Sequence, residues 1–207
     1  MGIYEFGDKS SNIVLIQPVD EQQLDVMSFE VGEIKRLSGK DFKLAAFPVG
    51  NWNKALSPWK APAVFGNDDF GDEAQNTLDA ILKYCDDSEK TYYLGGYSLA
   101  GLFSLWTAYR TGLFKGVAAV SPSMWFPGFD DYMKDNEIRC DNIYLSLGDK
   151  EEKARNPVMA TVGDRIREAE TLLKQQNVNC YLEWNESNHF KEPDVRISKG
   201  FSWVINQ

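Results

Sequence analysis

Short apolar runs alternate along the chain with longer segments in which apolar residues recur at helical spacing. This alternation is typical of a mostly parallel sheet covered by helices. The runs are nearly continuous and rich in aliphatic and aromatic residues, as expected of strands buried on both faces. They predict six strands, over residues 13–17, 42–47, 91–95, 116–120, 142–147 and 180–184.

The segments between the predicted strands carry apolar stripes that indicate helices with one face in the core. Two further helices are predicted over residues 102–109 and 195–205. No internal repeat, low-complexity tract or linker interrupts the pattern, so we expect one domain over residues 1–207. The stripes are formed by Leu24, Met27, Val31 and Ile34, by Ala74, Leu78, Ile81 and Cys85, and by Val162, Ile166, Ala169, Leu172 and Leu173.

The segment 50–72 breaks this regular pattern. It is rich in glycine and proline and contains two tryptophans, Trp52 and Trp59. A long irregular connection within a compact domain is usually functional or mobile. Because it follows the second predicted strand, we expect it at the carboxyl edge of the sheet, where open α/β folds bind ligands.

The composition is that of a globular protein, with 43% hydrophobic and 26% charged residues. A net charge of −9 disfavours nucleic acid and anionic membranes as partners, because both would be repelled. The oligomeric state cannot be read from the sequence. Neither a signal-peptide pattern nor a membrane-spanning apolar run is present, and three scattered cysteines form no C-x-x-C pair (Cys85, Cys140 and Cys180). These features predict a cytoplasmic protein with reduced thiols.

The most informative motif is Gly96-Tyr97-Ser98-Leu99-Ala100, which joins a predicted strand to a predicted helix. A serine flanked by small residues at such a turn is the arrangement of a nucleophile elbow. The helix that follows directs backbone N–H groups toward the serine, so the Leu99 N–H is a candidate oxyanion donor. The sequence has Ala100 where the usual G-x-S-x-G pattern has glycine. A glycine-rich turn with an incidental serine is the alternative interpretation.

The only histidine, His189, follows the last predicted strand, where this architecture places its general base. The carboxylate that would orient it should follow the fifth predicted strand. Three acids stand there, and we rank Glu151 first, Asp149 second and Glu152 third. Serine, acid and histidine then occur in the chain order of the α/β-hydrolase fold.

Three segments together resemble one esterase family: the elbow, Val120-Ser121-Pro122-Ser123-Met124-Trp125-Phe126, and the Asn188-His189-Phe190 sequence. This family includes the enterochelin esterases, S-formylglutathione hydrolase and feruloyl esterases. The resemblance covers roughly residues 91–207. It implies an α/β-hydrolase fold with about six parallel strands in the order 2-1-3-4-5-6, helices on both faces and a minimal N-terminal antiparallel part. It also implies small-molecule ester or thioester substrates, no metal and no organic cofactor, with Ser98, His189 and the acid of residues 148–152 as a catalytic triad.

The first predicted strand departs from that family. Its members usually have a His-Gly pair there, just before the second oxyanion donor, whereas this chain reads Gln17-Pro18-Val19-Asp20. Proline has no N–H, so the donor would be Val19 or Asp20. An aspartate beside the hole would oppose a developing negative charge.

The sequence therefore predicts a serine esterase that works through an acyl-serine intermediate. Trp125, Trp52 and Trp59 are candidates for lining its substrate pocket, although each could equally fill the core. Two alternatives remain open. One is an acyltransferase that uses the same Ser-His pair, and the other is a catalytically silent binding protein of the same fold.

Overall fold

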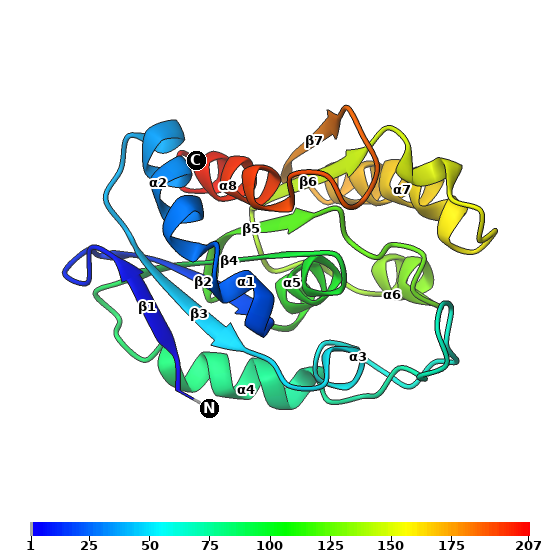
Figure 1. The fold of residues 1–207 in the computed structure, drawn as a ribbon, viewed down its shortest axis with the longest axis horizontal. Coiled ribbons are helices and arrows are strands. Elements are labelled where there is room, and N and C mark those ends of the chain that lie inside the picture. Colours follow the sequence, from blue (N-terminus) through cyan, green and yellow to red (C-terminus); the bar gives the residue numbers. More distant parts are fainter. Residues whose placement is uncertain (1) are drawn as a thin grey trace.

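The computed structural model describes residues 2–207, which contain a seven-stranded sheet (Figure 1). The strands are joined in the order β1-β3-β2-β4-β5-β6-β7, and every neighbouring pair is parallel except β1 with β3. Their bounds are β1 (Tyr4–Gly7), β2 (Ile13–Val19), β3 (Lys43–Pro48), β4 (Thr91–Tyr97), β5 (Phe114–Val120), β6 (Asn142–Gly148) and β7 (Asn179–Asn185).

The predicted sheet is confirmed in its six parallel strands and in their order. Strand β1 was not predicted as a strand. It is only four residues long, lies antiparallel at the edge of the sheet and has no buried residue, so it lacks the apolar run that marks the other strands. This single strand is the whole antiparallel part of the sheet in the described residues.

The predicted helices are all present, with small shifts at their ends. The stripe from Leu24 to Ile34 is divided between α1 and α2, because the chain turns at Asp25 and Val26. The bounds are α1 (Glu21–Leu24), α2 (Met27–Ser38), α3 (Trp52–Ala55), α4 (Ala74–Tyr84), α5 (Leu99–Arg110), α6 (Phe129–Asp135), α7 (Val162–Gln175) and α8 (Pro193–Val204), with two short 3₁₀ helices, η1 (Glu151–Lys153) and η2 (Met159–Thr161).

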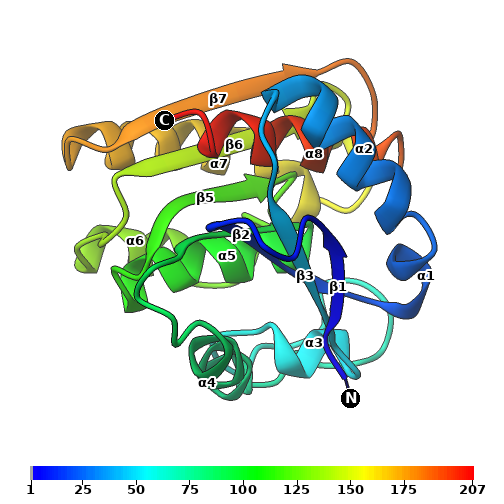
Figure 2. The ribbon, with the colours of Figure 1, turned by 90° about the vertical axis from the view of Figure 1, so that its left-hand side faces the viewer.

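The helices cover both faces of the sheet. Side chains of α2 and α8 pack in one apolar cluster, and side chains of α4, α5, α6 and α7 pack in a larger one. Figures 1 and 2 show α2 beside α8, with the strands between this pair and α5. The central strands β2, β4, β5 and β6 are therefore buried on both faces, which explains their continuous apolar sequences.

The carboxyl ends of the parallel strands bring several loops together at one edge of the sheet. The β4–α5 turn, the loops after β5, β6 and β7, and part of the segment 50–72 lie there. That segment is less irregular than its sequence suggests, because it contains α3 and an isolated antiparallel bridge between Ala61 and Phe70. No helix in the described part of the chain is both long and apolar enough to cross a membrane.

Candidate active site

Ser98 occupies a sharp turn between β4 and α5. Its backbone angles, φ 59° and ψ −120°, lie in a region that L-residues rarely adopt, at a cost of about 1–3 kcal/mol. Small neighbours permit this turn. A Cβ atom on Gly96 would lie 2.6 Å from the backbone of Ala100, and one on Gly101 would lie 2.9 Å from the Val120 carbonyl oxygen. The turn therefore requires the small residues by which the sequence motif was found.

The structure brings three of the candidate residues into one hydrogen-bonded relay. Ser98 Oγ lies 3.0 Å from His189 Nε2, and His189 Nδ1 lies 2.7 Å from Glu151 Oε2. An imidazole that donates its Nδ1–H to a carboxylate keeps Nε2 free to accept a proton. The relay is thus arranged so that His189 can remove the proton of Ser98.

Glu151 is almost fully buried and is held by four donors. Besides His189, its carboxylate accepts hydrogen bonds from the Gly148 N–H at 2.7 Å, Ser121 Oγ at 2.9 Å and Arg196 Nη1 at 3.0 Å. Burial by itself raises the pKa of a carboxyl. Here the hydrogen bond and charge of His189, with the bonds from Gly148 and Ser121, outweigh burial and hold the pKa of Glu151 below its usual value. The carboxylate therefore stays ionised.

The other two acids of this loop face elsewhere. Asp149 accepts a hydrogen bond from the Ser187 N–H at 2.8 Å, and Glu152 pairs with Arg167 at 2.9 Å. Neither carboxylate is bonded to His189. The geometry thus singles out the acid that the sequence ranked first.

Arg196 is a buried residue of the site to which sequence reasoning gave no role. Its Nη1 donates to Tyr97 Oη at 2.9 Å and to Ser121 Oγ at 2.9 Å, in addition to Glu151, and its Nη2 donates to the Asn188 carbonyl at 3.2 Å. One guanidinium thereby ties the elbow, the acid and the histidine loop together. The signal in the sequence was a charged residue between apolar ones at the start of the predicted C-terminal helix.

The candidate oxyanion donor Leu99 is the first residue of α5, so no carbonyl lies one turn before it within the helix. Its N–H belongs to the residue directly after Ser98, the position from which nucleophile elbows donate to an oxyanion. The carbonyl oxygen of Ser98 accepts bonds from Leu102 and Ser123 and is thereby turned into the protein. The Leu99 N–H is therefore left without an acceptor inside α5.

The second candidate donor, Val19, lies at the buried end of β2, beside Pro48 of β3. It does not line the cavity that contains Ser98. The neighbouring Asp20 carboxylate caps α1 by accepting the Gln23 N–H at 2.8 Å. Its charge is therefore already engaged with a helix N-terminus, where negative charge is stabilised.

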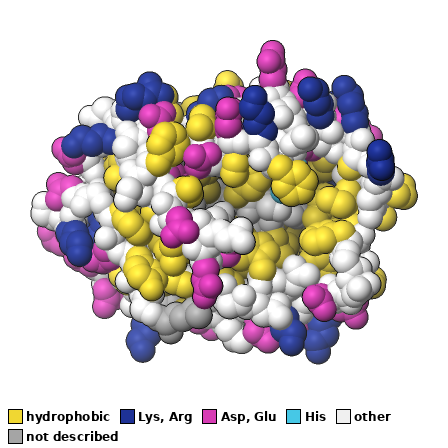
Figure 3. Space-filling model, in the orientation of Figure 1, with side chains coloured by type: hydrophobic (Ala, Val, Ile, Leu, Met, Phe, Trp, Pro, Cys, Tyr) yellow, Lys and Arg dark blue, Asp and Glu magenta, His cyan; other side chains and the backbone are white. Residues whose placement is uncertain are grey.

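Ser98, Glu151 and His189 open into a cavity of about 770 Å³, within the range of small-molecule sites. Apolar side chains form much of its wall, and Figure 3 shows such side chains bordering a hollow in this face of the molecule. The apolar lining consists of Phe65, Pro122, Trp125, Ala154, Met159, Val162 and Phe190.

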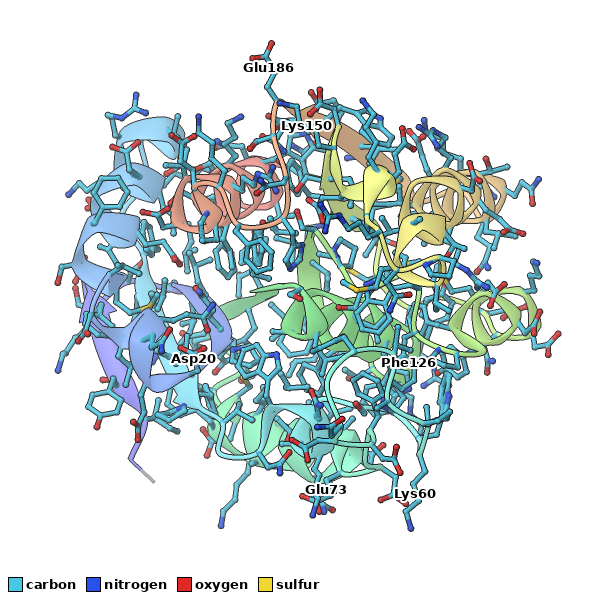
Figure 4. The ribbon with its side chains drawn as sticks, turned by 45° about the vertical axis from the view of Figure 1, so that its right-hand side comes forward. Asp20, Lys60, Glu73, Phe126, Lys150 and Glu186 are labelled. Carbon is cyan, nitrogen blue, oxygen red and sulfur yellow. The ribbon has the colours of Figure 1, made fainter. Side chains whose placement is uncertain are left out.

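Of the three tryptophans singled out in the sequence, only Trp125 lines this cavity. Trp59 donates its Nε1–H to the Pro127 carbonyl at 2.9 Å and packs among aromatic rings of the core, including Phe126, which Figure 4 labels. Trp52 is half-buried against the same core. The segment 50–72 reaches the cavity instead through Phe65, which lies edge-on to Trp125.

The described residues hold no group of three or more histidine, cysteine, aspartate or glutamate side chains that could bind a metal ion. The polar residues that line the cavity are those of the relay itself, Ser121, Asn188 and the basic residues of the loop after β6.

No protein-family model matches the chain, and no curated protein sequence matches it significantly. Several solved structures, however, superimpose on the chain. An IroE-like serine hydrolase from Shewanella oneidensis superimposes with a TM-score of 0.75 at 14% identity, over 97% of this chain and 74% of that one. The chain has the α/β-hydrolase fold.

Two further structures show the same likeness. The siderophore hydrolase EstA from Aspergillus nidulans has a TM-score of 0.71 at 16% identity, over 99% of this chain and 89% of that one. The enterobactin esterase FES from Shigella flexneri has a TM-score of 0.67 at 12% identity, over 99% of this chain and 55% of that one. At such identities the likeness establishes the fold, while the activity has to be argued from the site.

Proposed function

We propose that this chain is a serine esterase that hydrolyses carboxylic esters of small molecules through an acyl-serine intermediate. The observation that carries the proposal is the continuous relay from Ser98 through His189 to Glu151, at distances of 3.0 and 2.7 Å, beside a cavity large enough for a substrate. The proposal treats residues 1–207 as one α/β-hydrolase domain, supported by the single sheet that carries both apolar clusters.

In the proposed reaction, Ser98 Oγ attacks the ester carbonyl while His189 Nε2 accepts its proton. The negative charge that develops on the carbonyl oxygen faces the Leu99 N–H at the N-terminus of α5. His189 then protonates the departing alcohol, and Glu151 stabilises the imidazolium throughout. Water, activated by the same imidazole, cleaves the acyl-serine and restores the free enzyme.

A thioester would pass through the same steps with a thiol as leaving group, and an acyltransferase would use another acceptor in place of water. The three free cysteines, two of them buried, agree with a reducing compartment, and we propose that the protein acts in the cytoplasm.

The test is hydrolysis of 4-nitrophenyl esters of increasing acyl length by the wild type, Ser98→Ala and His189→Ala. We expect hydrolysis that Ser98→Ala abolishes and that His189→Ala lowers by roughly 10²–10⁴-fold in kcat/KM, the usual contribution of a general base. A rate of the wild type equal to that of Ser98→Ala would contradict the proposal. The alternative hypothesis, a catalytically silent binding protein of the same fold, would then be favoured.

A further inference from the structure

The cavity beside Ser98 has a basic rim, although the chain as a whole carries a net charge of −9. Lys150, Lys153 and Arg155 all line it, and all three belong to the loop that follows β6. Figure 4 labels Lys150, the second residue after the end of β6. Three positive charges in six residues are thus concentrated at the entrance to the proposed active site.

These three charges are not neutralised by neighbours. No side chain of Lys150, Lys153 or Arg155 forms an ion pair or a hydrogen bond with another described residue. The acids nearby in sequence are already engaged. Glu151 is bonded to Arg196 and His189, and Glu152 to Arg167.

The remaining acidic groups close in sequence do not compensate the rim either. The Asp149 carboxylate accepts the Ser187 N–H. The side chain of Glu186, which Figure 4 labels, extends outward from the molecule. Among the described residues, Glu151 is the only acid that lines the cavity, so the balance of charge there is positive in an otherwise acidic protein. Charges of one sign at a cleft raise the local concentration of ligands of the opposite sign.

The same cavity also has a large apolar lining. Phe190 is 87% exposed and Phe65 is 48% exposed, and both border the cavity, where Phe65 lies edge-on to buried Trp125. Exposed aromatic side chains at the mouth of a site indicate a surface that a ligand covers. The site therefore combines an apolar wall with unpaired cations at its edge.

We infer that the preferred substrates are amphipathic anions: esters in which an apolar segment lies between the scissile carbonyl and a carboxylate that Lys150, Lys153 and Arg155 bind. This inference rests on the proposed esterase function and names its substrate class. The carboxylate can belong to the acyl part, as in a half-ester of a dicarboxylic acid, or to the alcohol part, as in an acylated hydroxybenzoate.

The experiment compares matched esters with and without the charge. On the acyl side, the pair is the mono-4-nitrophenyl ester of hexanedioic acid and 4-nitrophenyl hexanoate. On the alcohol side, it is 4-acetoxybenzoate and 4-acetoxybenzamide. The readout is the ratio of kcat/KM for the anionic ester to that for the neutral one, because the intrinsic reactivity of each ester cancels when this ratio is compared between variants.

The test variant is K150Q/K153Q/R155Q, and the matched control is K83Q/K115Q/R139Q. The control removes two lysines and one arginine that are exposed, form no ion pair among the described residues and do not line this cavity. In at least one ester pair, the test variant should lower the ratio by roughly tenfold, mainly through KM of the anionic ester. The control should leave it within about twofold. Raising the ionic strength should reduce the wild-type ratio.

The pair that responds identifies the side of the ester that carries the charge. An equal ratio in the wild type and K150Q/K153Q/R155Q for both pairs would overturn the inference while leaving the esterase proposal intact. An equal fall in the control variant would also overturn it, because the effect would then reflect net charge alone. If Ser98→Ala hydrolysed all four esters as fast as the wild type, the proposed function itself would fail.

Discussion

Glu151 and Glu30 are both almost completely buried, yet their surroundings differ in one respect. Glu151 receives four hydrogen bonds, whereas Glu30 of α2 receives one long contact of 3.5 Å, from Gln17 Nε2. The second oxygen of Glu30 and Oε1 of Gln17 have no hydrogen-bond partner among the described residues. The same degree of burial therefore accompanies a fully bonded carboxylate at one position and a nearly isolated carboxyl at the other.

The two pKa values diverge accordingly. Burial raises the pKa of Glu30 to about 8, only partly opposed by Gln17 and assisted by the nearby charge of Asp194, while the donors around Glu151 hold its pKa low. Burial alone does not decide whether a carboxyl is charged. The hydrogen-bond donors around a carboxyl determine whether it is charged, and such donors surround Glu151, the acid that contacts His189.

The largest expected difference between the two glutamates is in activity. Glu151→Gln removes the charge that orients His189 and stabilises its protonated form, so kcat should fall by roughly 10²–10⁴-fold. Glu30→Gln should change kcat by less than about twofold, because Glu30 does not line the cavity. The measurement is steady-state hydrolysis of a 4-nitrophenyl ester.

Asp149→Asn and Glu152→Gln are matched controls on the same loop as Glu151, and both should remain near the wild-type rate. If all three loop variants retained wild-type rates, the relay in the structure would not be the one that acts in catalysis.

A smaller effect is expected on stability, and here Glu30 is the sensitive site. An unfolded glutamate has a pKa of about 4.3, so between about pH 4.3 and 8 this carboxyl is ionised in the unfolded chain but still protonated in the folded one. Ionisation then lowers the free energy of the unfolded state only. The raised pKa of Glu30 thus makes stability decline as pH rises through this window. Glu30→Gln should increase the free energy of unfolding by roughly 1–3 kcal/mol at pH 8, with little gain at pH 4.5.

Urea unfolding of the wild type and Glu30→Gln at both pH values measures this gain. Glu33→Gln, at a half-buried position on the same helix, removes only an ion pair with the exposed Arg36 and should change stability by no more than about 1 kcal/mol. A loss of stability in Glu30→Gln at pH 8 would show that the carboxylate is needed and that the contrast between the two glutamates is wrong.

The same two regions show what the sequence could and could not predict. The strands from β2 to β6 are largely buried and have nearly continuous apolar sequences, so they were found, together with their order. The sixth, β7, has no buried residue and was found because four of its residues 180–184 are apolar. Glu151 could be ranked first from its place after β6. Its partners Ser121 and Arg196 come from segments 30 and 45 residues away, and no local pattern reports such a contact.

The tryptophans illustrate a further limit. A tryptophan in a long loop can turn toward the core or toward a cavity, and the two cases have the same local sequence. Trp125 lines the cavity, Trp59 faces the core, and the neighbouring Phe65, which carried no signal of its own, borders the site. The buried contact between Glu30 of α2 and Gln17 of β2 was not predicted either, because the two residues lie in different elements and no local pattern reports their contact.

The central claim is that Ser98 is a nucleophile activated by His189, and covalent labelling tests it most directly. Wild type, His189→Ala and Ser98→Ala would be treated with a fluorophosphonate, and the modified peptide identified by mass spectrometry. We predict one label on Ser98 in the wild type, labelling slowed by roughly 10²-fold or more in His189→Ala, and none in Ser98→Ala. No label in the wild type, or a label on Ser121 or Ser123, would contradict the account.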